Sequence, residues 1–269
     1  MPGVANCYPL VTTVQLSPIQ LPRRLQALGW SRSVYVRGAA LGDAASVAIV
    51  GARAASGLAM ERAHVLARHL ATRGVHIVSG GALGVDGAAH RGALAGNGTT
   101  TVVLGSGLDV LYPVRHAPLF LDVLAHGGTL AGLVRDGTPP HPRQFPRRNK
   151  LIAALADVVI VVEADVRSGS LSTAAAGRRL GTIVAAWPGS RGCDQLLAAG
   201  AAIIENESDA ELALAGLPRH QAPRAIDPIV MQVRDAIANG AVGIDEIVHR
   251  TGLALRVVLR ALPMIERMQ

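Results

Sequence analysis

Short apolar runs alternate with longer amphipathic segments from residue 46 onward. The runs at 47–50, 76–78, 100–104, 129–134, 158–162, 182–186 and 202–204 have the length of buried strands. The segments at 57–73, 86–95, 117–126, 149–156, 170–180 and 195–199 space their apolar residues as helices do. This alternation predicts an α/β fold with a doubly wound, mostly parallel sheet and right-handed crossovers.

The ends of the chain follow a different pattern. Residues 1–45 contain scattered prolines and predict a short N-terminal lead-in with one helix, ahead of a main domain at 46–216. Residues 217–227, rich in proline and mixed charge, predict a linker. Residues 228–269 show three helical patterns with Gly252 at a turn, which predicts a small helix-turn-helix or truncated winged-helix-like domain. Asp245 and Glu246 stand at the start of the second of these helical patterns, where their negative charge disfavours contact with DNA. We therefore expect this domain to dock a partner or to dimerise rather than to bind duplex DNA sequence-specifically.

Composition narrows the class of partner. Only 3% of residues are aromatic, so small aliphatic side chains must build the core. The formal net charge of +7 favours a polyanion, although a merely basic cytosolic protein has the same balance. Cys7 and Cys193 do not form a disulfide framework or a metal-ligand spacing, so we expect no metal and no cofactor. With no apolar run of about 18 residues, we expect a cytoplasmic protein without a membrane segment.

Glycine-rich loops follow several predicted strands, where doubly wound sheets bind ligands. Gly51-Ala52-Arg53 could admit a phosphate to the backbone and pair it with a guanidinium, but glycine in such turns also serves close packing. The loop that begins at Ser79, Gly80 and Gly81 could expose successive N–H groups as an anion nest.

Two further loops carry the same kinds of residue. Gly105 and Ser106 precede Tyr112, which could stack on a base or be a buried structural tyrosine. In the loop at Ser168, Gly169 and Ser170, the hydroxyls could bind phosphate or cap the next helix.

A basic segment at residues 142–150 is the strongest single signal. Its four cations surround one of only two phenylalanines, and no acid interrupts them. Cations at a helix start oppose the helix dipole, which favours an anion-binding function over a merely solvated face. Phosphate pairing with base stacking is expected of single-strand binders. The candidate residues here are Phe145, Arg147, Arg148, Asn149 and Lys150.

Together these loops resemble the DprA/Smf (DNA processing protein A) family. The family pattern consists of a GSR turn, an SGxARGID loop, a GSGxDxxYP loop, an FPxRNR segment, an SGSLxTA turn and a PGS turn followed by G(T/C)N. All six occur in that order within residues 46–214. The resemblance implies a Rossmann-like fold that binds single-stranded DNA, dimerises and loads the RecA recombinase in natural transformation.

Four departures from the pattern bear on DNA binding. Ala52 replaces the serine of GSR, Leu83 the arginine of SGxARGID, Lys150 the last arginine of FPxRNR, and Asp194 the asparagine of the last motif. Ala52 removes a hydroxyl, and Leu83 removes a candidate phosphate contact. Lys150 keeps the charge without the planar fork, and Asp194 places an acid near the expected anion site. These changes predict either weaker DNA binding or a divergent paralogue.

Two other functions remain open on the same broad fold. A phosphoribohydrolase resembling the LOG/lysine-decarboxylase-like family would need a PGGxGTxxE loop, and the loop at 188–194 lacks its glutamate. A small-nucleotide sensor would use the same glycine loops without a strand-length groove. No catalytic pair is evident, so we expect a binding protein rather than an enzyme.

Overall fold

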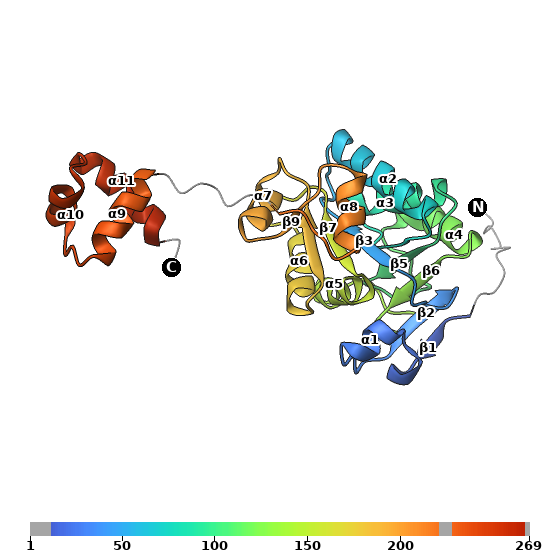
Figure 1. Ribbon diagram of the computed structural model, residues 1–269. Helices are drawn as coiled ribbons and strands as arrows, with labels where there is room; N and C mark the ends of the chain where they lie inside the picture. The colour runs from blue at the N-terminus through green and yellow to red at the C-terminus, as the bar shows by residue number, and fades with distance from the viewer. Residues whose placement is uncertain (1–11, 221–227, 267–269) are drawn as a thin grey trace. The chain divides into compact units, whose positions relative to one another are not determined.

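The structure is a computed structural model that describes residues 12–220 and 228–266. The chain divides into two compact units, 1–220 and 221–269 (Figure 1). Cys7 and residues 221–227 of the predicted linker lie outside the described residues.

Unit 1 is built on a nine-stranded sheet with the order β1-β2-β6-β5-β4-β3-β7-β8-β9. Strands β3 to β9 are parallel, and β1 and β2 are antiparallel additions beside β6. The strands are β1 Val14–Leu16, β2 Val34–Gly38, β3 Ser46–Val50, β4 His76–Ser79, β5 Thr100–Leu104, β6 Thr129–Gly132, β7 Val158–Val161, β8 Ile183–Ala186 and β9 Ala202–Ile203. The Rossmann-like, doubly wound fold is confirmed.

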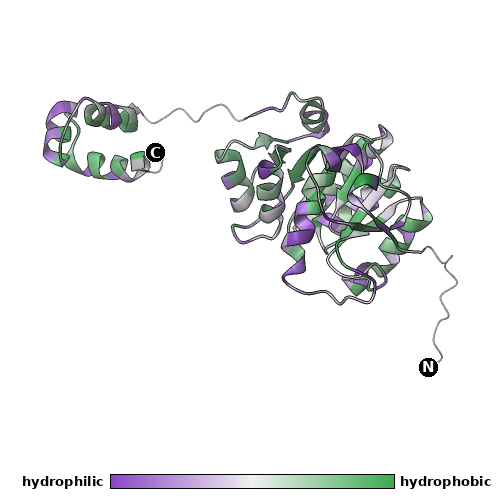
Figure 2. Ribbon diagram, turned by 90° about the horizontal axis from the view of Figure 1, so that it is seen from below, coloured by the Kyte–Doolittle hydropathy of each residue, from purple (hydrophilic) through white to green (hydrophobic). Residues whose placement is uncertain are grey.

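Helices cover both faces of this sheet. They are α1 Arg23–Ala27, α2 Gly57–Thr72, α3 Val85–Ala95, α4 Ala117–Ala125, α5 Gln144–Leu155, α6 Ser170–Arg179, α7 Arg191–Ala198 and α8 Glu207–Leu214, with short 3₁₀ turns at Pro18–Gln20 and Val114–His116. Successive residues of β3 enter opposite cores: Val47 and Ile49 pack with α2, α3 and α8, whereas Ala48 and Val50 pack with α5 and α6. The central strands are therefore apolar on both sides. Figure 2 shows hydrophobic residues in green.

The lead-in predicted for residues 1–45 differs in the structure. Its described part extends the same sheet through β1 and β2, and α1 packs against α5. Arg24 secures α1, since its guanidinium pairs with Asp157 at 2.6 Å and donates to the Thr182 hydroxyl at 3.1 Å. Two helices also differ from the prediction. Helix α5 begins at Gln144 rather than at residue 149, and helix α8 was not predicted.

Unit 2 contains α9 Pro228–Ala238, α10 Ile244–Thr251 and α11 Leu255–Glu266 around a small apolar core of its own. Gly252 ends α10 in the left-handed conformation at φ 67°, which a glycine adopts without steric cost. The described part of this unit is entirely helical, and its core includes Val233, Ile247 and Val258.

Candidate functional site

Strands β4, β5 and β6 follow β3 on one side of the sheet, whereas β7, β8 and β9 follow on its other side. The strand order therefore reverses between β3 and β7, and the space beyond the carboxyl ends of these two strands is a topological switch point. A cavity of about 600 Å³ lies there. The turn after β3 at residues 51–54 forms one wall, and Asp165, Ser168 and Gly169 before α6 form another, together with Ser170 at its start. The start of α5 contributes Phe145, Arg148 and Asn149. Ala82 and Asp86 of the loop after β4 also line it, so the fold brings four of the predicted segments to one cavity.

The half-buried ring of Phe145 is the centre of this site. The guanidinium carbon of Arg53 lies 5.3 Å from the ring centroid, and that of Arg148 lies 5.7 Å away. The centroid of the Tyr112 ring is 6.1 Å from that of Phe145, with the planes tilted by 48°. Cations at such distances are attracted by the ring. An aromatic face beside guanidinium groups can stack a nucleobase and attract the adjoining phosphate.

A second, smaller cavity of about 70 Å³ lies on the Tyr112 side of Phe145. Leu83 lines it, where the family pattern has arginine. Gly105 packs directly against Phe145, because an added Cβ there would lie 3.0 Å from the ring. Gly105 therefore leaves room for the aromatic ring, and it also lines the small cavity.

Arg148 lines both cavities but is itself buried. Its Nη1 donates to the carbonyl oxygens of Gly80 and Val103. Its Nε is buried and has no hydrogen-bond partner among the described residues. Burial lowers the pKa of this guanidinium to about 10, and the nearby Asp86 carboxylate opposes that shift. The positive charge of Arg148 thus orients the Gly80 loop and contributes to the potential of the cavity.

The carboxylate of Asp86 occupies the nest that the sequence predicts for an external anion. Its Oδ2 accepts from the backbone N–H groups of Gly80, at 3.2 Å, and Ala82, at 3.4 Å. Burial raises the pKa of Asp86, while Arg148 and these N–H groups act in the opposite direction. These two N–H groups therefore already have an acceptor within the protein, and Asp86 is a residue of this site that was not among the predicted binding residues.

Gly84 connects this loop to α3 at φ +77°, and an added Cβ would lie 2.3 Å from the carbonyl oxygen of Ala52. We expect Gly84→Ala to lower the free energy of unfolding by about 2–4 kcal/mol, because the residue must leave a left-handed conformation and the loop must shift. Urea denaturation measures this. Gly137→Ala, at φ +78° with open space around the Cβ, is the matched control and should cost less.

The other predicted loop residues lie inside the fold. Ser79 is buried and its hydroxyl donates to the Ile49 carbonyl at 2.6 Å. Ser106 is buried and its hydroxyl donates to the Val110 carbonyl at 2.7 Å. Gly81 packs against Phe120. These three residues shape the strand ends and do not line either cavity.

The turn before α6 does line the large cavity, and it is internally bonded. Ser168 and Ser170 join their hydroxyls at 2.7 Å, and the Ser170 N–H donates to the Ser168 hydroxyl at 3.3 Å. Asn149 reaches across from α5, and its Nδ2 donates to the Gly169 carbonyl at 3.2 Å and to the Ser172 hydroxyl at 2.6 Å. Asn149 therefore positions this wall of the cavity.

The remaining cations of α5 point elsewhere. Arg147 is exposed and lines neither cavity. The Lys150 ammonium lies 5.8 Å from the centroid of Trp30, in the part of unit 1 that contains α1. The structure thus brings Arg53, Phe145 and Arg148 together and separates Lys150 from them.

Ala52 and Asp194, two of the residues that depart from the family pattern, form hydrogen bonds within the protein. The Ala52 N–H donates to the Glu163 carbonyl at 2.8 Å, which ties the turn after β3 to the turn after β7. Asp194 accepts from the Gly189 N–H at 3.0 Å and does not line the large cavity. Neither residue places a charge in the site.

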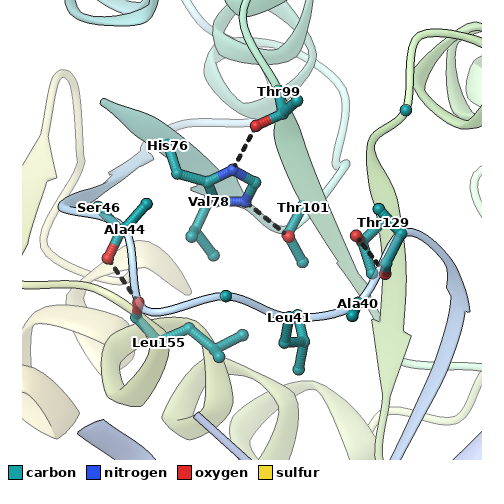
Figure 3. A pocket seen from close by; sticks show the side chains of 13 residues that line it. Ala40, Leu41, Ala44, Ser46, His76, Val78, Thr99, Thr101, Thr129 and Leu155 are labelled. Atoms are coloured by element: carbon teal, nitrogen blue, oxygen red, sulfur yellow. Dashed lines mark hydrogen bonds between the residues drawn. The ribbon is translucent and has the colours of Figure 1, made fainter. Parts of the chain in front are cut away.

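A cavity of about 190 Å³ lies at the opposite edge, where the parallel strands begin (Figure 3). His76 bonds through Nδ1 to the Thr99 hydroxyl at 2.9 Å and through Nε2 to the Thr101 hydroxyl at 2.8 Å. The Ser46 hydroxyl donates to the Leu155 carbonyl at 2.8 Å. Because these polar groups satisfy one another, the carboxyl-edge cavity is the better candidate site.

Within residues 12–220 and 228–266, no group of three or more potential ligands could hold a metal ion. No helix in those ranges is long and apolar enough to cross a membrane.

Comparison with known proteins assigns the fold and these loops to one family. Residues 20–214 match the family model described as DNA recombination-mediator protein A. The chain belongs to this DprA/Smf family. The DprA/Smf motifs identified in the sequence accordingly lie within the matched region.

Individual DprA/Smf proteins agree with this assignment. A putative DNA processing protein DprA of Mycobacterium tuberculosis is 41% identical over 239 residues, which cover 82% of this chain and 60% of that protein. The chain therefore spans about 60% of the length of that relative. Two solved structures, DprA of Streptococcus pneumoniae and DprA of Helicobacter pylori, are each 30% identical, with TM-scores of 0.68 and 0.69; they cover 78% and 77% of this chain, and 76% and 98% of theirs.

Proposed function

We propose that this chain binds single-stranded DNA at the carboxyl edge of its sheet, with a base stacked on Phe145 and the adjoining phosphate near Arg53. The observation that carries the proposal is the Phe145 ring with the Arg53 and Arg148 guanidinium groups 5.3 and 5.7 Å from its centroid. The net charge of +7 supports a polyanionic partner. A single-stranded DNA binding mode is described for the H. pylori relative, which also supports the proposal.

Within DNA processing, we further propose that the bound strand is passed to the RecA recombinase by a cytoplasmic homodimer that is not an enzyme. The family description as a recombination mediator supports this role. The binding groups of the site are an aromatic ring, guanidinium groups and a lined cavity, and they suffice for capture of a strand without a chemical step.

The decisive experiment is a salt series with a fluorescent thymine 20-mer, read by anisotropy on the full chain. We expect log Kd to rise steeply with log salt concentration because phosphate contacts release counterions. Arg53→Gln should weaken binding and flatten the slope by about one unit, as expected for one lost phosphate contact. Lys150→Gln removes the same charge away from the cavities and should keep the slope of the original chain.

Failure to bind the 20-mer at low salt would overturn the proposal. The 600 Å³ cavity at a switch point also has room for a single nucleotide, so thymidine monophosphate is included as a competitor. Tight binding of the monophosphate without binding of the strand would favour the small-nucleotide sensor instead.

A further inference from the structure

Tyr112 lies beside the proposed platform but is not required by it. Its side chain is 41% exposed, whereas Phe120, Trp30 and Trp187 are buried. Its hydroxyl has no hydrogen-bond partner among the described residues. An exposed ring of this kind is available for contact with a ligand.

The geometry of the two rings suits two bases rather than one. Their centroids are 6.1 Å apart and their planes are tilted by 48°, so the faces cannot clamp a single flat base between them. Each ring can instead support its own base, as on the successive aromatic platforms of proteins that bind single strands.

Arg53 and the small cavity connect these two platforms. Arg53 lines both cavities, and the small cavity also contains Tyr112, Phe145 and Leu83. None of the described residues that line the small cavity is acidic, whereas the large cavity includes Asp86 and Asp165. A phosphate between two stacked nucleotides would therefore meet a guanidinium and no carboxylate from these lining residues on the Tyr112 side.

We propose that Tyr112 is a second base platform, so that the site stacks two neighbouring bases of one strand, one on Phe145 and one on Tyr112. This inference rests on the proposed function, because it extends the same strand by one nucleotide. It assigns a binding role to the loop after β5, whose glycine and serine are otherwise occupied with packing the interior.

The test uses the shortest thymine strand that keeps full affinity for the full chain, so that sliding cannot hide a missing base. An abasic residue is placed at each position in turn. In the original chain we expect two neighbouring sensitive positions, each costing about tenfold in Kd. In Tyr112→Leu only one of them should remain sensitive, whereas Tyr112→Phe should keep both.

A misfolded Tyr112→Leu variant would lower affinity for every strand alike, so the loss of sensitivity at one position identifies stacking on Tyr112. If the strand binds and depends on Phe145 but Tyr112→Leu leaves the abasic profile unchanged, the second platform is wrong and the proposed function stands. If no strand binds to the original chain, the proposed function itself fails.

Discussion

Replacing Phe145 with leucine is expected to weaken binding of a thymine 20-mer by about ten- to a hundredfold, from about 1–3 kcal/mol per stacked base. The side chain sits at the junction of both cavities, with the Arg53 and Arg148 guanidinium groups beside its ring. Leucine retains apolar contact with Gly105 but presents no flat face to a base. Anisotropy at a single moderate salt concentration measures the loss.

Two controls make this result specific to stacking. Phe145→Tyr keeps an aromatic face and should bind within a few-fold of the original chain. The salt slope of Phe145→Leu should equal that of the original chain, because no cation is removed. Equal affinity of the leucine and phenylalanine chains would place the strand elsewhere on the protein.

Acidification from pH 7 to 4.5 is expected to lower the free energy of unfolding by up to about 5 kcal/mol through one buried and one half-buried histidine, at about 1.4 kcal/mol per pKa unit. Burial lowers the pKa of His76 to about 4 and that of His90 to about 3, from 6.5. Below pH 6.5 these two histidines therefore bind protons in the unfolded chain but stay neutral in the folded chain. Stability is full above that pH and falls as the pH drops towards the folded values.

Urea denaturation at both pH values tests this expectation. His90 is fully buried, with Nδ1 bonded to the Thr100 hydroxyl at 2.8 Å and Nε2 without a partner among the described residues. His90→Met should roughly halve the acid-induced loss, whatever its stability at pH 7. His126→Gln, at an exposed position, serves as the control. An unchanged loss in His90→Met would contradict the assignment.

The parallel part of the sheet was predictable because its strands are apolar on both faces and end at glycine-rich turns. The antiparallel edge was not. β1 has three residues, two of them exposed, and β2 alternates buried and half-buried positions over only four residues before an exposed fifth. Strands this short carry little periodic signal, and they form because β6 offers an open edge for pairing.

The site was predictable in its residue types and less so in their directions. Arg147, Arg148 and Lys150 were grouped because they are adjacent in sequence, but a helix turns about 100° per residue. Arg148 falls at the centre of the face that Leu151, Ile152 and Leu155 bury, so it points inward. That helical spacing was present in the sequence and could have separated Arg148 from its neighbours. The capture of the Gly80 loop by Asp86 depends on three-dimensional placement and could not have been found in this way.

The carboxylate of Asp86 has a consequence for the kinetics of the site. A loop that becomes ordered only when a phosphate binds must lose conformational entropy in each binding event. That loss slows association and lowers affinity. Here the Gly80 and Ala82 amides are already bonded to Asp86. We therefore expect the strand to meet a surface that is in its working shape beforehand, so that association is fast and no affinity is spent on ordering this loop.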